Sequence, residues 1–201
     1  SDCVALGVMG LLPHKVDLIV SGINPAPNLG HDVTYSGTVT AVMEGIIWGV
    51  PGVAVSLDGG DTDIHDLDYG PAVEIACRVV QSLVDRGLPV GTFLNVNVPN
   101  EPLERIKGIQ PTCQGLRVYR DRLDRRLDPR GRDYYWIGGD RPTGVPKEGT
   151  DVGALAAGYA SVTPLTLDMT AHEVLRTMRE WGWAAEYAPS HNGSGAGSSH
   201  G

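Results

Sequence analysis

One segment of the chain carries hydroxyl and glycine residues at a spacing suited to binding an anion. It ends at Ser36-Gly37-Thr38, directly before a helix-forming run. Ser36 and Thr38 supply hydroxyl donors, and Gly37 lets the backbone come close to a ligand. A helix that begins here adds free N–H groups and the positive end of its dipole. The expected chemistry is therefore phosphate binding.

The same segment contains two amide side chains, Asn24 and Asn28, whose oxygens are hard ligands suited to Mg²⁺, Mn²⁺ or Ca²⁺. Two neutral amides hold such a cation poorly, and Asp32 is the only carboxylate nearby. The helix dipole contributes only about 0.3–1 kcal/mol, or about 2 kcal/mol when partly buried. Tight phosphate binding therefore needs a metal or several added hydrogen bonds.

Each of these residues also has an ordinary structural explanation. An Asn in a loop rich in Gly and Pro usually forms a turn, and Ser36 before a helix is usually an N-cap. His31 could act as an acid or base, but an exposed loop histidine is the favoured interpretation. The acidic run over residues 58–68 lacks the pattern of a calcium-binding loop and is interpreted as a solvated loop.

Alternating helices and strands must position this segment. Apolar patterns predict helices over 2–12, 36–48 and 71–86, and buried strands over 17–21, 52–57 and 93–98. That order predicts a parallel sheet with right-handed crossovers. In open α/β sheets, ligands bind outside the carboxyl ends of the strands. The predicted loop over 22–35 is therefore placed where a site is expected.

The second half of the chain has a different character. Residues 105–140 are rich in charged and aromatic side chains and predict a long hairpin that turns near 128–131. A strand over 158–163 and a helix capped by Thr170 follow, and this helix ends near Trp183. The Gly/Ser-rich residues 190–201 are predicted to be disordered.

Composition excludes some partners. The formal net charge of −8 argues against a broad nucleic-acid surface, and no apolar run is long enough to span a membrane. The Arg residues over 117–132 lie among Tyr and Trp, a mixture typical of protein interfaces, so we favour assembly. The three cysteines are odd in number and have no zinc-ligand spacing. We therefore expect the protein to be located in the reducing cytoplasm.

The segment from Ser21 to Gly45 reads SGIN-x-x-x-NLG-x-D-x-x-YSGTV-x-A-x-x-EG. This string is similar to the signature of the SurE family of nucleotidases. Further similar segments follow in the family's order, and the resemblance covers residues 2 to about 181. They are Asp2-Cys3-Val4, Pro51 to Ser56, Leu94 to Pro99, Tyr134 to Gly139, Thr150-Asp151-Val152 and Gly158 to Leu165.

The resemblance implies a Rossmann-like parallel sheet with a projecting β-hairpin and a C-terminal strand and helix extension used in oligomerisation. It implies one divalent metal per subunit, Mg²⁺ or Mn²⁺, with Asn24 as a ligand. It assigns Asn28, Ser36, Gly37 and Thr38 to the substrate phosphate. The implied reaction is hydrolysis of nucleoside 5′- and 3′-monophosphates, with short polyphosphate as a further substrate, in a homodimer or homotetramer.

The sequence departs from the family at one point. The family's metal is also held by two adjacent Asp residues and a Ser of an N-terminal segment, and this chain has no Asp-Asp pair. The expected domain is therefore 1–189 without its N-terminal segment, with an α/β core over 1–100 and the hairpin and oligomerisation elements over 101–189. The catalytic residues stay unknown, and we expect this chain alone to be inactive.

Two other functions stay open. One is a nucleotide-binding regulatory module without hydrolysis, and the other is a structural assembly protein. An upstream strand that ends in two Asp residues would favour the enzyme over the regulatory module. If the chain were only a structural assembly protein, neither phosphate nor a metal would bind near Asn24 and Ser36.

Overall fold

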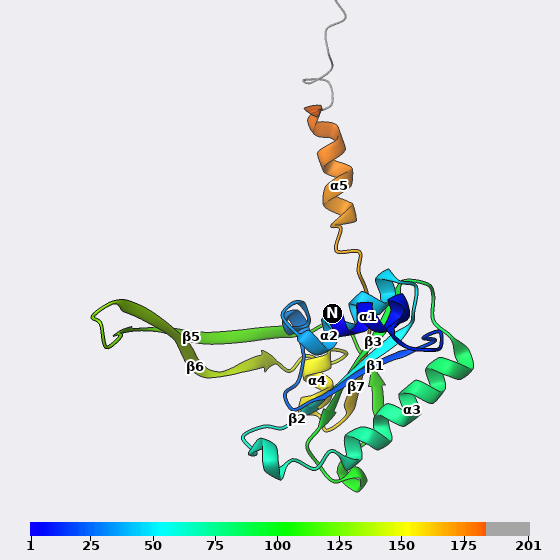
Figure 1. The fold of residues 1–201 in the computed structure, drawn as a ribbon, viewed down its shortest axis with the longest axis horizontal. Helices are drawn as coiled ribbons and strands as arrows, with labels where there is room; N and C mark the ends of the chain where they lie inside the picture. Colours follow the sequence, from blue (N-terminus) through cyan, green and yellow to red (C-terminus); the bar gives the residue numbers. More distant parts are fainter. Residues whose placement is uncertain (184–201) are drawn as a thin grey trace, which may run out of the picture. The chain divides into compact units, whose positions relative to one another are not determined.

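The structure, a computed structural model, describes residues 1–183 apart from the side chains of residues 121, 140 and 141. Its centre is a five-stranded sheet of order β1-β2-β3-β7-β4 (Figure 1). The strands are β1 Ile19–Asn24, β2 Gly52–Asp58, β3 Thr92–Pro99, β4 Ile109–Pro111 and β7 Ala160–Thr166. Strands β1, β2 and β3 are parallel, β7 runs antiparallel to β3, and β4 is parallel to β7. The predicted α/β class is confirmed, and the sheet is mixed because β7 and β4 both run opposite to β1, β2 and β3.

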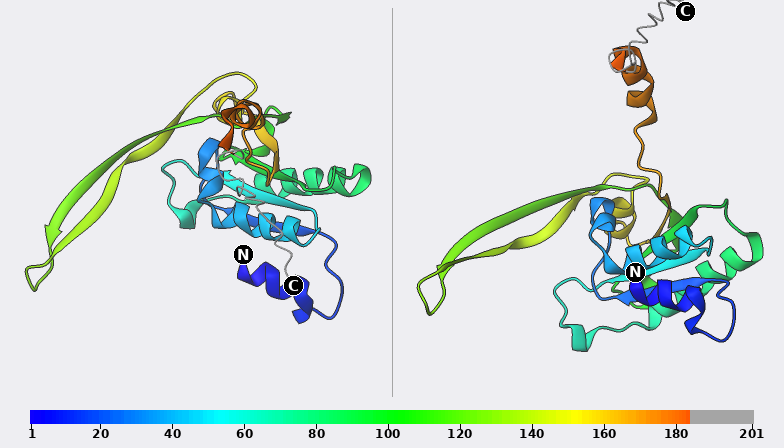
Figure 2. Two further views of the ribbon diagram at one scale, coloured as in Figure 1. Left: turned by 90° about the horizontal axis from the view of Figure 1, so that it is seen from above. Right: turned by 45° about the horizontal axis from the view of Figure 1, so that its top comes forward.

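Helices cover both faces of this sheet (Figures 1 and 2). They are α1 Asp2–Leu6 with a π-helical turn Gly7–Leu11, α2 Gly37–Ile47, α3 Gly70–Arg86 and α4 Asp151–Ala156. Single 3₁₀ turns lie at Gly30–Thr34, Ile64–Asp66 and Leu103–Arg105. Val39 and Val42 of α2 pack in one apolar cluster, and Ile75 and Val79 of α3 pack in a second cluster. The short α4 had no counterpart among the predicted elements.

Local sequence explains where the central elements begin and end. Strands β2 and β3 are almost entirely buried, as expected for strands covered on both faces. Helix α3 has Pro71 in its first turn and ends at Gly87, whose φ of +71° favours glycine. These helix limits agree with the prediction from the sequence.

Strand β1 differs from its prediction. It begins at Ile19 and continues through Asn24, so Gly22 and Asn24 belong to the strand and not to the loop. The register with β2 is irregular between Ser21 and Asn24. Gly22 has a φ of +126°, and a Cβ atom there would collide with the Val55 carbonyl oxygen of β2. Glycine is therefore required for this close approach of the two strands.

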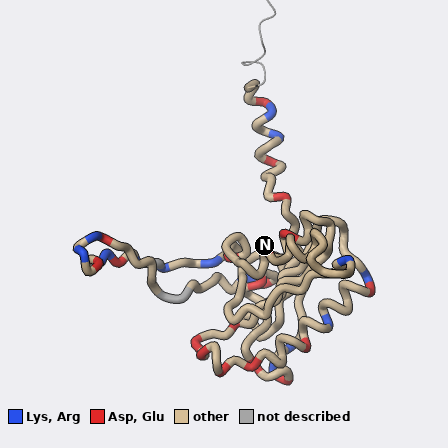
Figure 3. The backbone as a smooth tube through the Cα atoms, viewed as in Figure 1, with Lys and Arg blue, Asp and Glu red and all other residues tan. Residues whose placement is uncertain are grey.

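The predicted hairpin is confirmed. It consists of β5 Leu116–Leu127 and β6 Asp133–Val145, which pair only with each other in a two-stranded sheet. Acidic and basic residues are interleaved along it (Figure 3). Its arginines form ion pairs at N–O distances of 2.7 to 2.9 Å, namely Arg125 with Asp133, Arg126 with Asp124 and Arg132 with Asp128. These pairs reduce the positive charge that a nucleic acid would meet.

The chain divides into two compact units, Ser1–Leu167 and Asp168–Gly201. The second contains helix α5 His172–Met178 and the turn Arg179–Trp181. The prediction that Thr170 caps this helix is wrong, because α5 begins after Ala171 and has no side-chain cap. The tail predicted over 190–201 lies outside the described residues. Over the described part of the chain, no helix has the length and apolar content needed to cross a membrane.

Candidate phosphate-binding site

The predicted site residues lie where strand β1 ends and helix α2 begins, at the carboxyl edge of the parallel strands. Asn24 is the last residue of β1, and its Nδ2 donates to the Ala26 carbonyl oxygen at 2.6 Å. This bond orients the side chain, and no hydrogen bond from the described residues occupies Oδ1, which could accept from a ligand or coordinate a cation. Asn24 therefore fits the role of a single neutral metal ligand.

The first turn of α2 supplies the other predicted residues. Ser36 is the N-cap, and its Oγ accepts a hydrogen bond from the Val39 N–H at 3.1 Å. Gly37 is exposed, and a Cβ atom there would meet no described atom within 4 Å. Packing among the described residues therefore does not require glycine at residue 37, and the space beside it is open to a ligand. Since α2 has 11 residues, its first turn presents free N–H groups and a full dipole.

Asn28 is buried against strands β2 and β3. Its backbone N–H donates to Asn97 Oδ1 at 2.7 Å, and its carbonyl accepts from Asn95 Nδ2 at 2.8 Å and Asn97 Nδ2 at 3.1 Å. Its side-chain Nδ2 donates to Ser56 Oγ at 2.7 Å. Sequence reasoning missed Ser56, Asn95 and Asn97. A signal was present, because polar residues at alternate positions of an otherwise apolar strand mark a polar face.

A buried carboxylate fixes the next part of the loop. Asp151, at the start of α4, accepts backbone N–H groups from Gly30 at 2.8 Å, Gly115 at 2.7 Å and Val152 at 2.8 Å. A Cβ atom at Gly30 would collide with the Gly115 carbonyl oxygen, so the backbones meet closely here. Asp151 therefore joins the site loop, the base of the hairpin and α4 at one point. Sequence reasoning assigned Asp151 no role beyond its place in a segment similar to the family's.

Asp32 contacts the base of the hairpin and not Asn24 or Asn28. Its Oδ2 lies 2.8 Å from Arg117 Nε, without hydrogen-bond alignment, and both side chains are largely buried. Its Oδ1 accepts from the Tyr119 hydroxyl. This hydrogen bond, followed by burial, raises the pKa of Tyr119 to about 12. The only carboxylate of the loop is thus engaged with Arg117 and Tyr119.

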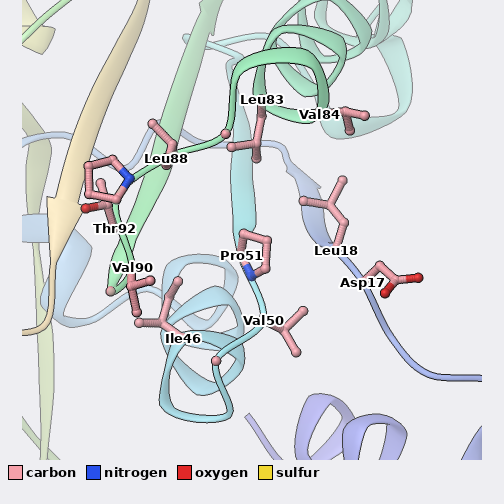
Figure 4. A pocket seen from close by; sticks show the side chains of 14 residues that line it. Asp17, Leu18, Ile46, Val50, Pro51, Leu83, Val84, Leu88, Val90 and Thr92 are labelled. Carbon is pink, nitrogen blue, oxygen red and sulfur yellow. The ribbon is translucent and has the colours of Figure 1, made fainter.

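Two cavities lie at opposite ends of the strands. An open polar cavity of about 700 Å³ adjoins the site loop and is lined by Ala26, Pro27, Asp32, Asp58, Asp61, Arg117 and Pro142. An apolar cavity of about 400 Å³ lies at the amino ends of β1, β2 and β3, where Val50, Leu83 and Leu88 line it (Figure 4). Of these two, the polar cavity lies at the carboxyl ends of the strands, where a ligand is expected. Its lining contains three carboxylates and one guanidinium and none of the four residues assigned to the substrate phosphate.

The other candidates stay outside this arrangement. His31 is exposed, as the loop interpretation requires. In the acidic run, Asp63 and Asp68 accept from the backbone N–H groups of His65 and Gly70, which is ordinary turn bonding. Among the side chains that the structure describes, no three of His, Cys, Asp or Glu cluster so as to hold a metal ion.

The family model described as "Survival protein SurE" matches residues 1–121, which is more than half of the chain. The chain belongs to the SurE family. A 5'-nucleotidase SurE of Chloroflexus aggregans is 49% identical over 187 residues, which cover 91% of this chain and 72% of that protein. A 5'-nucleotidase SurE of Heliobacterium modesticaldum is 48% identical over 181 residues, or 90% of this chain and 65% of that protein.

A solved structure agrees with this assignment. The SurE protein from Aquifex aeolicus is 42% identical and superposes with a TM-score of 0.74, covering 90% of this chain and 71% of that one. The Rossmann-like fold implied by the resemblance is confirmed at this level of similarity. The present chain thus spans about two thirds to three quarters of the length of these SurE proteins.

Proposed function

We propose that this chain binds the phosphate of nucleoside 5′- and 3′-monophosphates and is the substrate-binding part of a SurE phosphomonoesterase, which also accepts short polyphosphate. The observation that carries the proposal is the segment from Asn24 to Thr38, placed at the carboxyl edge of the sheet and entering the free N-terminus of α2. Relatives that are nearly half identical are named 5'-nucleotidase SurE, which supports the same reaction class.

In this proposal the residues of the chain bind and orient the phosphate. The N–H groups of Gly37 and Thr38 and the hydroxyls of Ser36 and Thr38 donate to its oxygens, and Asn28 adds an amide donor. The positive end of the α2 dipole favours the negative charge. In the family's reaction, hydrolysis breaks the bond between phosphorus and the nucleoside oxygen. The hydroxyl of water then bonds to phosphorus, and the other water proton goes to the nucleoside oxygen.

The proposed reaction of the family requires a divalent cation, Mg²⁺ or Mn²⁺. Asn24 offers one neutral oxygen to it. The described residues add no cluster of His, Cys, Asp or Glu around such an ion, and Asp32 is engaged with Arg117 and Tyr119. The described residues therefore do not fit a complete metal site. We expect this chain to bind phosphate without turning a substrate over.

Binding and turnover are measured separately. Calorimetry with inorganic phosphate and with AMP should show binding by the unmodified chain. Gly37→Ala should weaken it about tenfold, since a methyl group would occupy the position that a phosphate oxygen approaches. Its folding stability should be unchanged or about 0.5–1 kcal/mol higher, because glycine is costly in helices.

Gly7→Ala is the matched control, since a Cβ atom there meets only Leu12 at an ordinary 3.6 Å. This variant should bind phosphate as the unmodified chain does. If the unmodified chain bound no phosphate, the proposed site would be wrong. Phosphate release from AMP with Mg²⁺ or Mn²⁺ would instead show that the chain needs no further carboxylates.

A further inference from the structure

One face of the sheet changes from apolar to polar along its strands. Side chains that point toward α2 are apolar near the amino ends, at Ala54 and Phe93. Toward the carboxyl ends the same face carries Ser56, Asn95 and Asn97, all completely buried. The α3 face stays apolar over the same length, with Val53, Val55, Leu57, Leu94, Val96 and Val98. In β2 and β3 the buried polar side chains therefore lie on the α2 face toward the carboxyl ends, and the row continues into β7 at Ser161.

Burying polar side chains destabilises a fold unless they form hydrogen bonds, and these bonds converge on one residue. Asn97 forms two hydrogen bonds with the backbone of Asn28, and Asn95 forms a third. Asn95 Oδ1 and Ser161 Oγ are buried without a hydrogen-bond partner among the described residues. The polar row is thus not arranged for stability alone, because well-packed apolar side chains would leave no such atoms unpaired.

Ser56 has a different contact from the two asparagines. It is the one residue of the row that bonds the side chain of Asn28, at 2.7 Å from Nδ2. This bond uses one of the two Nδ2 hydrogens and limits rotation of the amide. Among the described residues, no donor reaches Asn28 Oδ1. The second Nδ2 hydrogen and Oδ1 are therefore left for a ligand, in an orientation set by Ser56.

We infer that Ser56 is a positioning residue of the phosphate site, which orients the Asn28 amide while Asn95 and Asn97 fix the Asn28 backbone. This role rests on the proposed phosphate binding. Ser56 acts through Asn28 and touches no substrate itself. With the Ser56 hydroxyl present, the Asn28 amide keeps one orientation, in which its free Nδ2 hydrogen can donate to a phosphate oxygen. Without the hydroxyl, the amide rotates among several rotamers.

The fold provides a matched control on the other side of Asn97. In the sheet register, Asn97 lies beside Ser56 of β2 and beside Ser161 of β7. Both serines are completely buried, but Ser161 Oγ has no hydrogen-bond partner among the described residues and so forms no hydrogen bond with Asn28. Ser56→Ala and Ser161→Ala therefore remove the same atom from the same row, and only the first removes a contact of Asn28.

The test compares these variants by calorimetry with inorganic phosphate and by nuclear magnetic resonance of the Asn28 side-chain amide. We expect Ser56→Ala to raise the phosphate Kd about tenfold and to speed exchange of the Asn28 amide hydrogens with solvent. Ser161→Ala should change neither quantity. Ser56→Thr, which keeps the hydroxyl, should restore the affinity. Thermal unfolding of the two alanine variants checks that both fold.

The possible outcomes distinguish the positioning role of Ser56 from phosphate binding itself. Equal phosphate affinity in the unmodified chain and Ser56→Ala overturns the positioning role and leaves phosphate binding in place. Equal losses in Ser56→Ala and Ser161→Ala also overturn it, since the effect would then belong to the sheet. No phosphate binding by the unmodified chain overturns the proposed function, and the role of Ser56 with it.

Discussion

At the base of the hairpin the Tyr119 hydroxyl donates to the Asp32 carboxylate, and the pKa of Tyr119 rises from 10.0 to about 12. Below pH 10 the phenol is protonated in both the folded and the unfolded chain. Between pH 10 and 12 the unfolded chain loses this proton first. The contribution of Tyr119 to stability is therefore complete below pH 10 and is lost as the pH rises to 12.

This predicts one late step in a spectrophotometric tyrosine titration of the folded chain. Tyr119→Phe should remove the step, because no other tyrosine hydroxyl bonds Asp32 among the described residues. Tyr135→Phe, on the hairpin, should leave the step in place. A late step that persists in Tyr119→Phe would show that another group causes it.

At the scale of elements, Asp151 joins the site loop, the base of the hairpin just before β5, and helix α4 through three backbone N–H groups. Asp151→Asn replaces one acceptor oxygen with an amide donor that would face those N–H groups. We expect it to lower the free energy of unfolding by about 1–3 kcal/mol, the cost of leaving buried groups unpaired. Urea denaturation measures this change.

The control for this prediction is Asp63→Asn, since Asp63 accepts one N–H in an exposed turn. Surface changes of this kind usually stay within about 0.5 kcal/mol. If Asp151→Asn is as mild as Asp63→Asn, the three bonds do not hold the elements together. Helix α4 was missed in the sequence because its six residues are too few to show a helical period.

At the scale of the whole molecule, the hairpin exposes apolar side chains that the described part of the chain does not cover. Leu123 and Ile137 lie opposite each other in the β5–β6 register and are 67% and 76% exposed. Their face also carries Leu127 and Tyr135, both largely exposed. We propose that this face contacts a second copy of the chain in a homodimer or homotetramer, since aromatic and apolar residues mixed with Arg are typical of interfaces.

The prediction is that Leu123→Ser combined with Ile137→Ser lowers the molar mass in light scattering toward that of one chain. Arg130→Gln, at the turn of the hairpin, is the control and should keep the mass of the unmodified chain. A monomeric unmodified chain, or a double variant with unchanged mass, would contradict assembly through this face. The folded core should be unaffected in both variants, since these side chains pack against no core cluster.

The sequence by itself determined the order of the main elements and the segment where the site lies. Buried apolar runs, Pro71, Gly87 and the Ser36 cap are local signals, and they located the buried strands and the limits of α2 and α3 without knowledge of the fold. Local signals did not locate the end of β1 or the start of α5. The motif from Asn24 to Thr38 is contiguous, so its residue types and spacing were visible directly. Its resemblance to one family then supplied the expected fold, which the comparisons confirmed.

Only the tertiary structure decided what holds that motif in place. Asn28 is bonded by residues 28, 67 and 69 positions away, and Gly30 by Asp151 at a distance of 121 positions. The tertiary structure also showed that Asp32 contacts Arg117 and Tyr119 and that β1 extends through Asn24. Such contacts depend on which strands become neighbours and on which face each side chain lies. Periodicity within a single segment does not contain that information.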